Sequence, residues 1–356
     1  MITRRKFHSY LQSSILCLMG MLLSVASYGQ GSTKSIFDVM NHTEVLDLRI
    51  EADFEDLKNN RRTAEYQFGN LAFSDEDKVG QEWAVKVRPR GKYRRRICEM
   101  PPLKIKFSKS DLAERGLNDF NDLKLVTHCV EDKSEAKELL MKEYLAYKLY
   151  NELTPNSFRV QMVKITYVDS KTGKKEKNWG FLIEDKNQVE DRLGAELCDC
   201  RGTTELDLDI ATEEMMTVFQ YMIGNEDWDL AQTKNLKMFQ TSEKIIPVPY
   251  DFDFAGMVNA PYARASKTYG LLTVQQRAYF GTSQFNENLE DTKNYFEVKK
   301  DALYNIVKNF KPLSNQTRLE VIGYFDEFYA NIDSIKKTEK IKRTVQPAVS
   351  QATLVK

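Results

Sequence analysis

Two kinds of hydrophobic periodicity follow one another along this 356-residue chain, and their order restricts the fold more than any other feature. Apolar and polar residues alternate in three stretches, at 45–50, 83–88 and 103–107, as in half-buried strands. A helical pattern follows at 134–153, with Ser134 as the expected N-cap, and two further strands are expected near 160–168 and 179–184. Beyond them the sequence is helical and rich in loops. This order predicts an α+β protein with a strand-rich first part.

Composition excludes several classes of protein. Hydrophobic residues make up 42% and charged residues 29%, which indicates a folded chain. Lysine plus arginine equals aspartate plus glutamate, at 52 each, so no basic excess points to nucleic acid as a partner. Three histidines are too few for a histidine-rich metal site.

The N-terminus has the layout of a secretory signal peptide. Arg4, Arg5 and Lys6 precede an apolar run over 15–25, and small residues follow, with cleavage expected before Gln30. A membrane anchor is the alternative, but the run is shorter than the roughly 20 apolar residues a span requires. We therefore expect an exported protein, located in the periplasm, at the cell surface or outside the cell, with no membrane span after cleavage.

Four regions follow from these patterns: a signal peptide (1–29), a strand-rich lobe (30–186), a helical lobe (187–338) and a flexible tail (339–356). Cleavage of the signal peptide leaves four cysteines. Cys198 and Cys200 are too close together for a zinc knuckle and have no second ligand pair. We expect either structural thiols or one disulfide, with Cys98 and Cys129 as the candidate pair.

The densest acidic group lies in the second half of the chain. Asp227 and Asn235 occupy one loop, and Asp251 and Asp253 come directly after an apolar strand at 245–248. Such carboxylate and amide oxygens suit Mg²⁺ held between protein and phosphates. The alternative is that these residues merely cap and solvate turns.

Two charged groups upstream could complete such a site. Lys104 and Lys106 share the polar face of one expected strand, and Glu143 lies in an otherwise apolar or aromatic stripe of the expected helix. A carboxylate in such a stripe needs a partner, and a lysine on a neighbouring strand is one candidate. A glutamate hydrogen-bonded to backbone is the other.

A loop at 88–96 carries six cations around Gly91. They could cover a polyphosphate or a phosphorylated substrate, or they could form a solvated hairpin. The chain contains neither a G-x-G-x-x-G loop nor a Walker motif.

Taken in order, these short motifs resemble the CotH family, the kinase-like spore-coat-protein-H proteins. The matching pieces are Arg88-x-Arg90-Gly91, 102–107, 122–125, Lys142-Glu143, Gly224-Asn225-x-Asp227-Trp228 and Tyr250–Asp253. The resemblance covers roughly residues 85–260. It implies an atypical two-lobed protein-kinase fold, with a strand-rich N-terminal lobe containing one helix and a helical C-terminal lobe. It also implies ATP and Mg²⁺ or Mn²⁺ as cofactors.

The resemblance implies a role for each candidate residue. Lys106 or Lys104 would contact the phosphates with Glu143 as partner, Arg90 would assist, and adenine would lie beside the connection after Glu184. Asp227 would be the catalytic aspartate, Asp251 (or Asp253) the metal ligand, and Asn235 the second metal ligand. Ordinary kinases separate the catalytic aspartate and the asparagine by about five residues, but here the separation is eight, so Gln232 is an alternative to Asn235.

The expected activity is transfer of the γ-phosphoryl group of ATP to a serine or threonine hydroxyl of a protein. Two alternatives remain. One is a glycan hydrolase that uses Asp227 and Asp251 as paired carboxylates. The other is a non-catalytic pseudokinase that binds a surface or matrix.

Overall fold

The computed structural model describes residues 33–63, 65–91, 93–267, 270–281 and 286–335. The predicted signal peptide (1–29) and tail (339–356) lie outside these residues. No helix within the described ranges is long and apolar enough to span a membrane.

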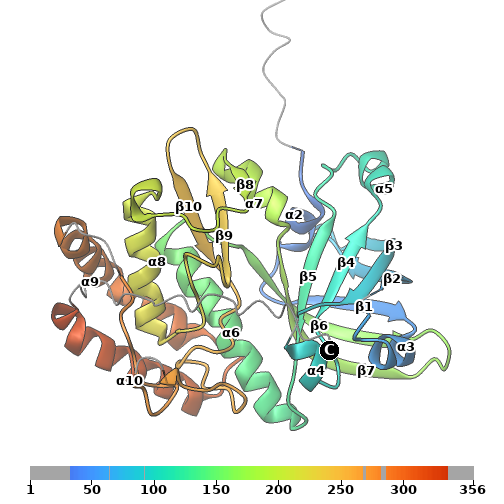
Figure 1. Cartoon of the computed structure of the whole chain (residues 1–356). Coiled ribbons are helices and arrows are strands. Elements are labelled where there is room, and N and C mark those ends of the chain that lie inside the picture. Colours follow the sequence, from blue (N-terminus) through green and yellow to red (C-terminus); the bar gives the residue numbers. More distant parts are fainter. Residues whose placement is uncertain (1–32, 64, 92, 268–269, 282–285, 336–356) are drawn as a thin grey trace, which may run out of the picture.

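Seven strands of the first half close into a barrel (Figure 1). In chain order they are β1 (Leu46–Ala52), β2 (Gln67–Ser74), β3 (Gly80–Pro89), β4 (Leu103–Phe107), β5 (Asp122–Thr127), β6 (Val160–Asp169) and β7 (Lys175–Ile183). Their order around the barrel is β1-β2-β3-β4-β5-β7-β6. Neighbours are antiparallel except β1 and β6, whose parallel pairing from Leu46↔Val163 to Ala52↔Asp169 closes the ring.

Alternation along each strand separates the two faces of the barrel wall. In β4, Leu103, Ile105 and Phe107 are buried, whereas Lys106 is exposed. Buried apolar residues of all seven strands contribute to one cluster inside the barrel. Close strand spacing also requires glycine at one position, because a Cβ on Gly180 of β7 would lie 2.8 Å from the carbonyl oxygen of Val126.

This barrel contradicts the predicted two-lobed kinase-like fold. The structure has a closed, mixed seven-stranded barrel in place of a kinase-like N-terminal lobe. Strand alternation is the same in an open sheet and a closed barrel, so the pattern could not distinguish them. Closure depends on β1 meeting β6, which is more than 100 residues away in sequence.

Helices and a small sheet form the second part of the molecule. The long helix α6 (Lys133–Leu153) interrupts the barrel strands, and its N-cap is Asp132 rather than the predicted Ser134. A three-stranded antiparallel sheet contains β8 (Glu196–Cys198), β9 (Leu236–Gln240) and β10 (Ile245–Pro249). Helices α8 (Ile210–Ile223), α9 (Asn286–Asn309) and α10 (Asn315–Asn331) pack with α6 in a second apolar core (Figure 1).

Short helices connect several of these elements. They are α2 (Ile36–Met40), α3 (Phe54–Asn59), α4 (Arg94–Ile97), α5 (Lys109–Glu114), α7 (Lys186–Leu193) and the 3₁₀ turns at Glu205–Asp207 and Ile332–Ser334. The predicted disulfide between Cys98 and Cys129 is confirmed, and it joins the residue after α4 to the loop after β5. Cys198 and Cys200 form a second disulfide.

Candidate functional site

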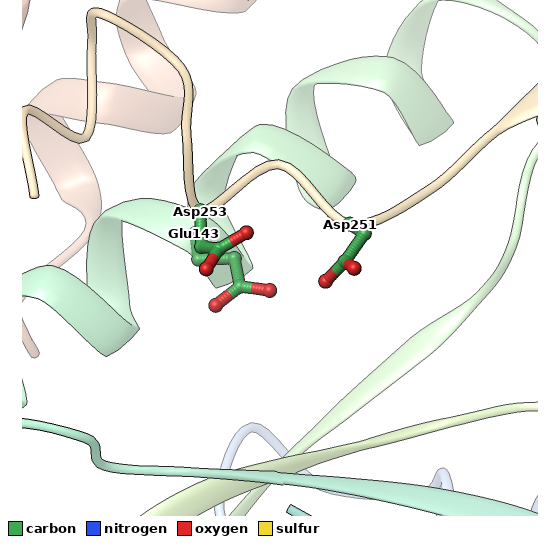
Figure 2. A group of neighbouring side chains, drawn as sticks. All are labelled: Glu143, Asp251 and Asp253. Atoms are coloured by element: carbon green, nitrogen blue, oxygen red, sulfur yellow. The ribbon is translucent and has the colours of Figure 1, made fainter. Parts of the chain in front are cut away.

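Three carboxylates from two distant parts of the chain meet beside α6. Figure 2 shows Glu143 on the helix, with Asp251 and Asp253 on the segment that follows β10. One oxygen of each carboxylate lies within 4.8 Å of the others. We call Glu143, Asp251 and Asp253 the acidic triad.

Local geometry explains why both aspartates reach α6. Asp251 has φ of +69°, in the left-handed region, which turns the chain just after β10. Its backbone N–H donates to the hydroxyl oxygen of Tyr147 at 2.8 Å. Tyr147 lies four residues after Glu143 and therefore on the same face of α6. One helix face thus supplies both a triad carboxylate and the anchor for the aspartate segment.

Arg94, the first residue of α4, is the counter-ion of this triad. Its Nη2 lies 2.6 Å from Glu143 Oε2 and 2.8 Å from Asp253 Oδ2, and its Nε donates to the same Asp253 oxygen at 2.9 Å. The three side chains are between 3% and 9% exposed. A single guanidinium therefore neutralises one of three clustered carboxylates, and the site keeps an excess of negative charge.

Burial governs the protonation of the two paired carboxyls. It raises the pKa of Glu143 and of Asp253, while the attraction of Arg94 acts in the opposite direction. The charge of Asp251 raises both values further. Glu143 Oε1 is also buried, with no hydrogen-bond partner among the residues that the structure describes. A divalent cation would satisfy that oxygen and the excess charge together, so the residues present fit an oxygen-coordinated metal.

The Asp227 loop brings together two residues that are eight positions apart. The side-chain amide of Asn235 donates to Asp227 Oδ2 at 2.8 Å and to the Asp227 carbonyl oxygen at 2.7 Å. Lys234 forms an ion pair with the other carboxylate oxygen. The alternative to Asn235, Gln232, is exposed and contributes its backbone N–H to Asp229. The loop therefore places Asn235, not Gln232, against Asp227.

A group of cations lies around Tyr250, the residue before Asp251. Lys124 of β5 has its Nζ 5.0 Å from the Phe158 ring centre and 4.8 Å from that of Tyr250. Lys237 of β9 lies 5.5 Å from the same Tyr250 ring. Burial lowers the pKa of Lys124 to about 7, with contributions from the positive charges of Arg90 and Lys237, whereas Asp251 opposes the shift. We call Lys124, Lys237 and Arg90 the cationic cluster.

The predicted pairing of Lys106 or Lys104 with Glu143 is wrong. Lys106 is exposed on the outside of the barrel, and Lys104 pairs with Asp122 at 2.7 Å. Glu143 pairs with Arg94 instead. The sequence pattern pointed to the correct glutamate because its stripe is local, but it assigned no individual role to Arg94, Lys124 or Lys237.

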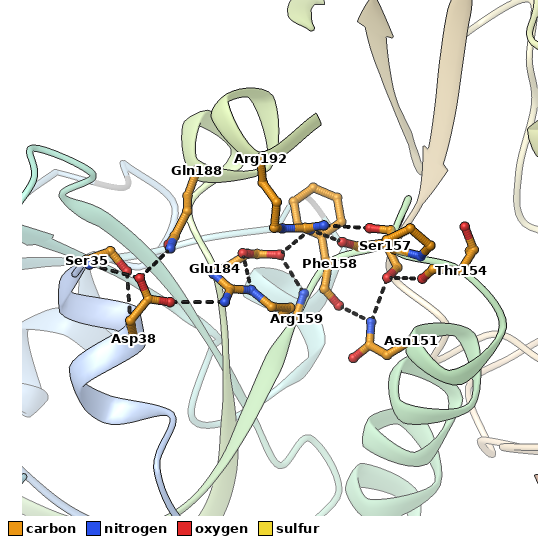
Figure 3. A network of polar contacts seen from close by, with 11 residues as sticks. Ser35, Asp38, Asn151, Thr154, Ser157, Phe158, Arg159, Glu184, Gln188 and Arg192 are labelled. Atoms are coloured by element: carbon orange, nitrogen blue, oxygen red, sulfur yellow. Dashed lines mark hydrogen bonds and ion pairs between the residues drawn. The ribbon is translucent and has the colours of Figure 1, made fainter. Parts of the chain in front are cut away.

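Glu184 has structural partners. It is fully buried, and its carboxylate accepts from Arg159 at 2.8 Å and from Arg192 at 2.9 Å (Figure 3). Arg159 also pairs with Asp38 at 3.0 Å, which ties α2 to β6 and β7. Both carboxylate oxygens are engaged in this network. The predicted adenine contact depends on backbone groups of the connection after Glu184 and stays a prediction.

The remaining polar contacts in Figure 3 extend the same network. Ser35 caps α2 through Asp38, Gln188 donates to Asp38, Arg192 donates to the carbonyl oxygens of Pro155 and Ser157, and Asn151 donates to Ser157 and Phe158. The network links α2, α7 and the end of α6 to the barrel.

Comparison of the sequence with protein-family models and with curated proteins finds no match.

Proposed function

We propose that this chain is an exported, metal-dependent phosphotransferase that moves the γ-phosphoryl group of ATP to a serine or threonine hydroxyl of a protein. The observation that carries the proposal is that the acidic triad and the cationic cluster meet at one point of the chain: Lys124 Nζ lies 4.8 Å from the ring centre of Tyr250, the residue before Asp251. A nucleotide polyphosphate with its metal has the complementary arrangement of charges.

Each group has a defined task under this proposal. Asp251, Asp253 and Glu143 would hold Mg²⁺ or Mn²⁺, which would neutralise charge on the phosphates. Lys124, Lys237 and Arg90 would bind phosphate oxygens, and the aromatic faces of Phe158 and Tyr250 hold the Lys124 ammonium in place. Asp227, oriented by Asn235 and Lys234, would accept the proton of the acceptor hydroxyl.

The order of the motifs that resemble CotH proteins points to the same activity, but the fold expected from that resemblance is not the one found, and no family model matches the chain. A glycan hydrolase would need only two carboxylates and would leave the cationic cluster without a task. A non-catalytic protein is favoured by one observation, since Arg94 already occupies two of the three triad carboxylates.

Phosphoryl transfer tests the proposal directly. The mature chain is incubated with γ-labelled ATP and Mg²⁺ or Mn²⁺, with dephosphorylated casein as acceptor, and label in casein and in the chain itself is measured. We expect the parent chain to incorporate label. Asp227→Asn should abolish this incorporation, and the control Asp301→Asn, at an exposed position of α9, should retain it. Nucleotide binding without transfer would identify the non-catalytic alternative, and the absence of both would refute the proposal.

A further inference from the structure

The outer face of the barrel carries an unusual alignment of like charges. In register, Lys86 of β3 lies opposite Lys106 of β4, and Arg88 lies opposite Lys104. Lys104 in turn lies opposite Lys124 of β5. We call these five residues the basic strip.

Such an alignment destabilises the free barrel. Side chains directly opposite one another in antiparallel strands have Cβ atoms about 4.5–5.5 Å apart, and like charges there repel. Every like-charged cross-strand pair in the described barrel register belongs to this strip. Asp122 lies opposite Lys106 in the register but forms its ion pair with Lys104. Lys86 and Lys106 are exposed and have no ion pair in the described part of the chain.

An exposed aromatic ring ends the strip on its far side. Phe68 of β2 lies opposite Lys86 and is 82% exposed, with the lysine Nζ 5.3 Å from the ring centre. Tyr66 has the guanidinium of Arg88 5.0 Å from its ring. A large apolar side chain that remains in water on a sheet face is available to a partner.

The near end of the strip belongs to the candidate site. Lys124 is a member of both the basic strip and the cationic cluster beside Asp251. Figure 1 shows β5, β4, β3 and β2 side by side, with β5 nearest to the second part of the molecule and β2 farthest from it. Four strands cover about 14 Å at their usual spacing, which an extended chain crosses with four or five residues at roughly 3.3 Å each.

We propose that the basic strip binds an extended acidic segment of the acceptor protein, with an apolar side chain of that segment resting on Phe68. That this partner is the phosphoryl acceptor rests on the proposed function, whereas the binding of an acidic segment does not. Charge complementarity selects an anionic partner, and the exposed ring of Phe68 selects one that also carries apolar side chains. A flat membrane would reach only part of this convex wall, and the equal numbers of cations and anions provide no long-range attraction for nucleic acid.

Binding of two labelled octapeptides tests the assignment without ATP or metal. One peptide contains six glutamates, a leucine and a serine, and in the other the glutamates are replaced by glutamines. We expect the acidic peptide to bind the mature chain, by fluorescence anisotropy at low salt, and the neutral peptide to bind at least about tenfold more weakly. Raising the salt concentration should weaken the acidic complex, because exposed charges are screened.

Variants then locate the binding surface. We expect the double variant Lys86→Ala with Lys106→Ala to bind the acidic peptide at least about tenfold more weakly. The control double variant Lys171→Ala with Lys175→Ala, at exposed lysines at the start of β7 and just before it, should bind the peptide as tightly as the parent does. The parent chain should bind a peptide that contains leucine more tightly than one with alanine in its place, and Phe68→Ala should abolish this difference in affinity. Circular dichroism of each variant confirms folding.

Three results would overturn the proposal: no preference for the acidic peptide, an equal loss in the control double variant, or binding of phosphatidylglycerol vesicles or heparin that depends on the strip while the peptide does not bind. None of these measurements uses the acidic triad. Failure of nucleotide binding and failure of peptide docking are therefore distinguishable.

Discussion

At the residue scale, Arg94 determines the electrostatics of the acidic triad. It forms ion pairs with the buried carboxyl groups of Glu143 and Asp253. Arg94 is one of six cations in the loop at 88–96, and the sequence does not indicate which of the six points into the protein. Glu143, in contrast, could be predicted from sequence, because a charged residue in an apolar helical stripe requires a partner whatever the fold is.

Removal of Arg94 should be costly. Arg94→Ala leaves the buried carboxyl groups of Glu143 and Asp253 without their shared hydrogen-bonding and ion-pair partner, so we expect the free energy of unfolding to fall by about 3–5 kcal/mol in urea titrations at neutral pH. Arg96→Ala, at an exposed position of the same helix, should change it by less than about 0.5 kcal/mol. Similar effects from both variants would show that Arg94 is not the counter-ion.

The raised pKa of Glu143, about 8, predicts a pH dependence of stability. A carboxyl whose pKa is higher in the folded state binds more protons there. Its contribution to stability is therefore complete below its ordinary pKa of 4.5 and is lost as the pH rises through about 8. Glu143→Gln should lessen the decrease in unfolding free energy between pH 5 and pH 8 in metal-free buffer.

The matched control for this experiment is Glu135→Gln, at an exposed position on the same helix, which should leave the pH profile unchanged. If Glu143→Gln also preserves the parent profile, Glu143 does not titrate as the structure indicates.

At the element scale, α4 is held against the site by its neighbouring disulfide. Cys98 follows the helix directly, and its bond to Cys129 closes a loop of 31 residues that contains all of β4 and β5.

Strands β4 and β5 also explain why the wrong lysine was predicted as the partner of Glu143. Alternation predicts that Lys104, Lys106 and Lys124 all point outwards, but only the register and the contacts of β5 bring Lys124 close to Asp251.

Loss of this disulfide should destabilise the fold. Cys98→Ser with Cys129→Ser frees a loop of this length in the unfolded state, which corresponds to about 3–4 kcal/mol in the chain-entropy model. Cys198→Ser with Cys200→Ser opens a loop with a sequence separation of only 2 and should cost much less. Urea titrations of both pairs measure the difference, and an equal loss would contradict the role assigned to the Cys98 bond.

At the scale of the whole molecule, local patterns could be predicted and long-range closure could not. Periodicity located strands near β1, β3, β4, β6 and β7 and the helix α6, because each pattern depends on neighbours in sequence. The barrel strands β2 and β5 were not among the strands expected from periodicity. In β2, the exposed Phe68 and the adjacent Gly69 interrupt the alternation. Closure through β1 and β6 and the contact between Arg94 and Asp253, 159 residues apart, depend on tertiary packing that no local pattern encodes.

The proposed function requires the acidic triad and the cationic cluster to form one site for a metal–nucleotide complex. Calorimetric titration of the mature chain with Mg·ATP tests this requirement, with Asp251→Asn and the control Asp301→Asn measured alongside. We expect saturable binding to the parent and to the control. In Asp251→Asn, which preserves volume but removes a charge, binding should be weaker by about a hundredfold, or ~2.7 kcal/mol. Absence of binding to the parent, or equal affinity in Asp251→Asn, would contradict it.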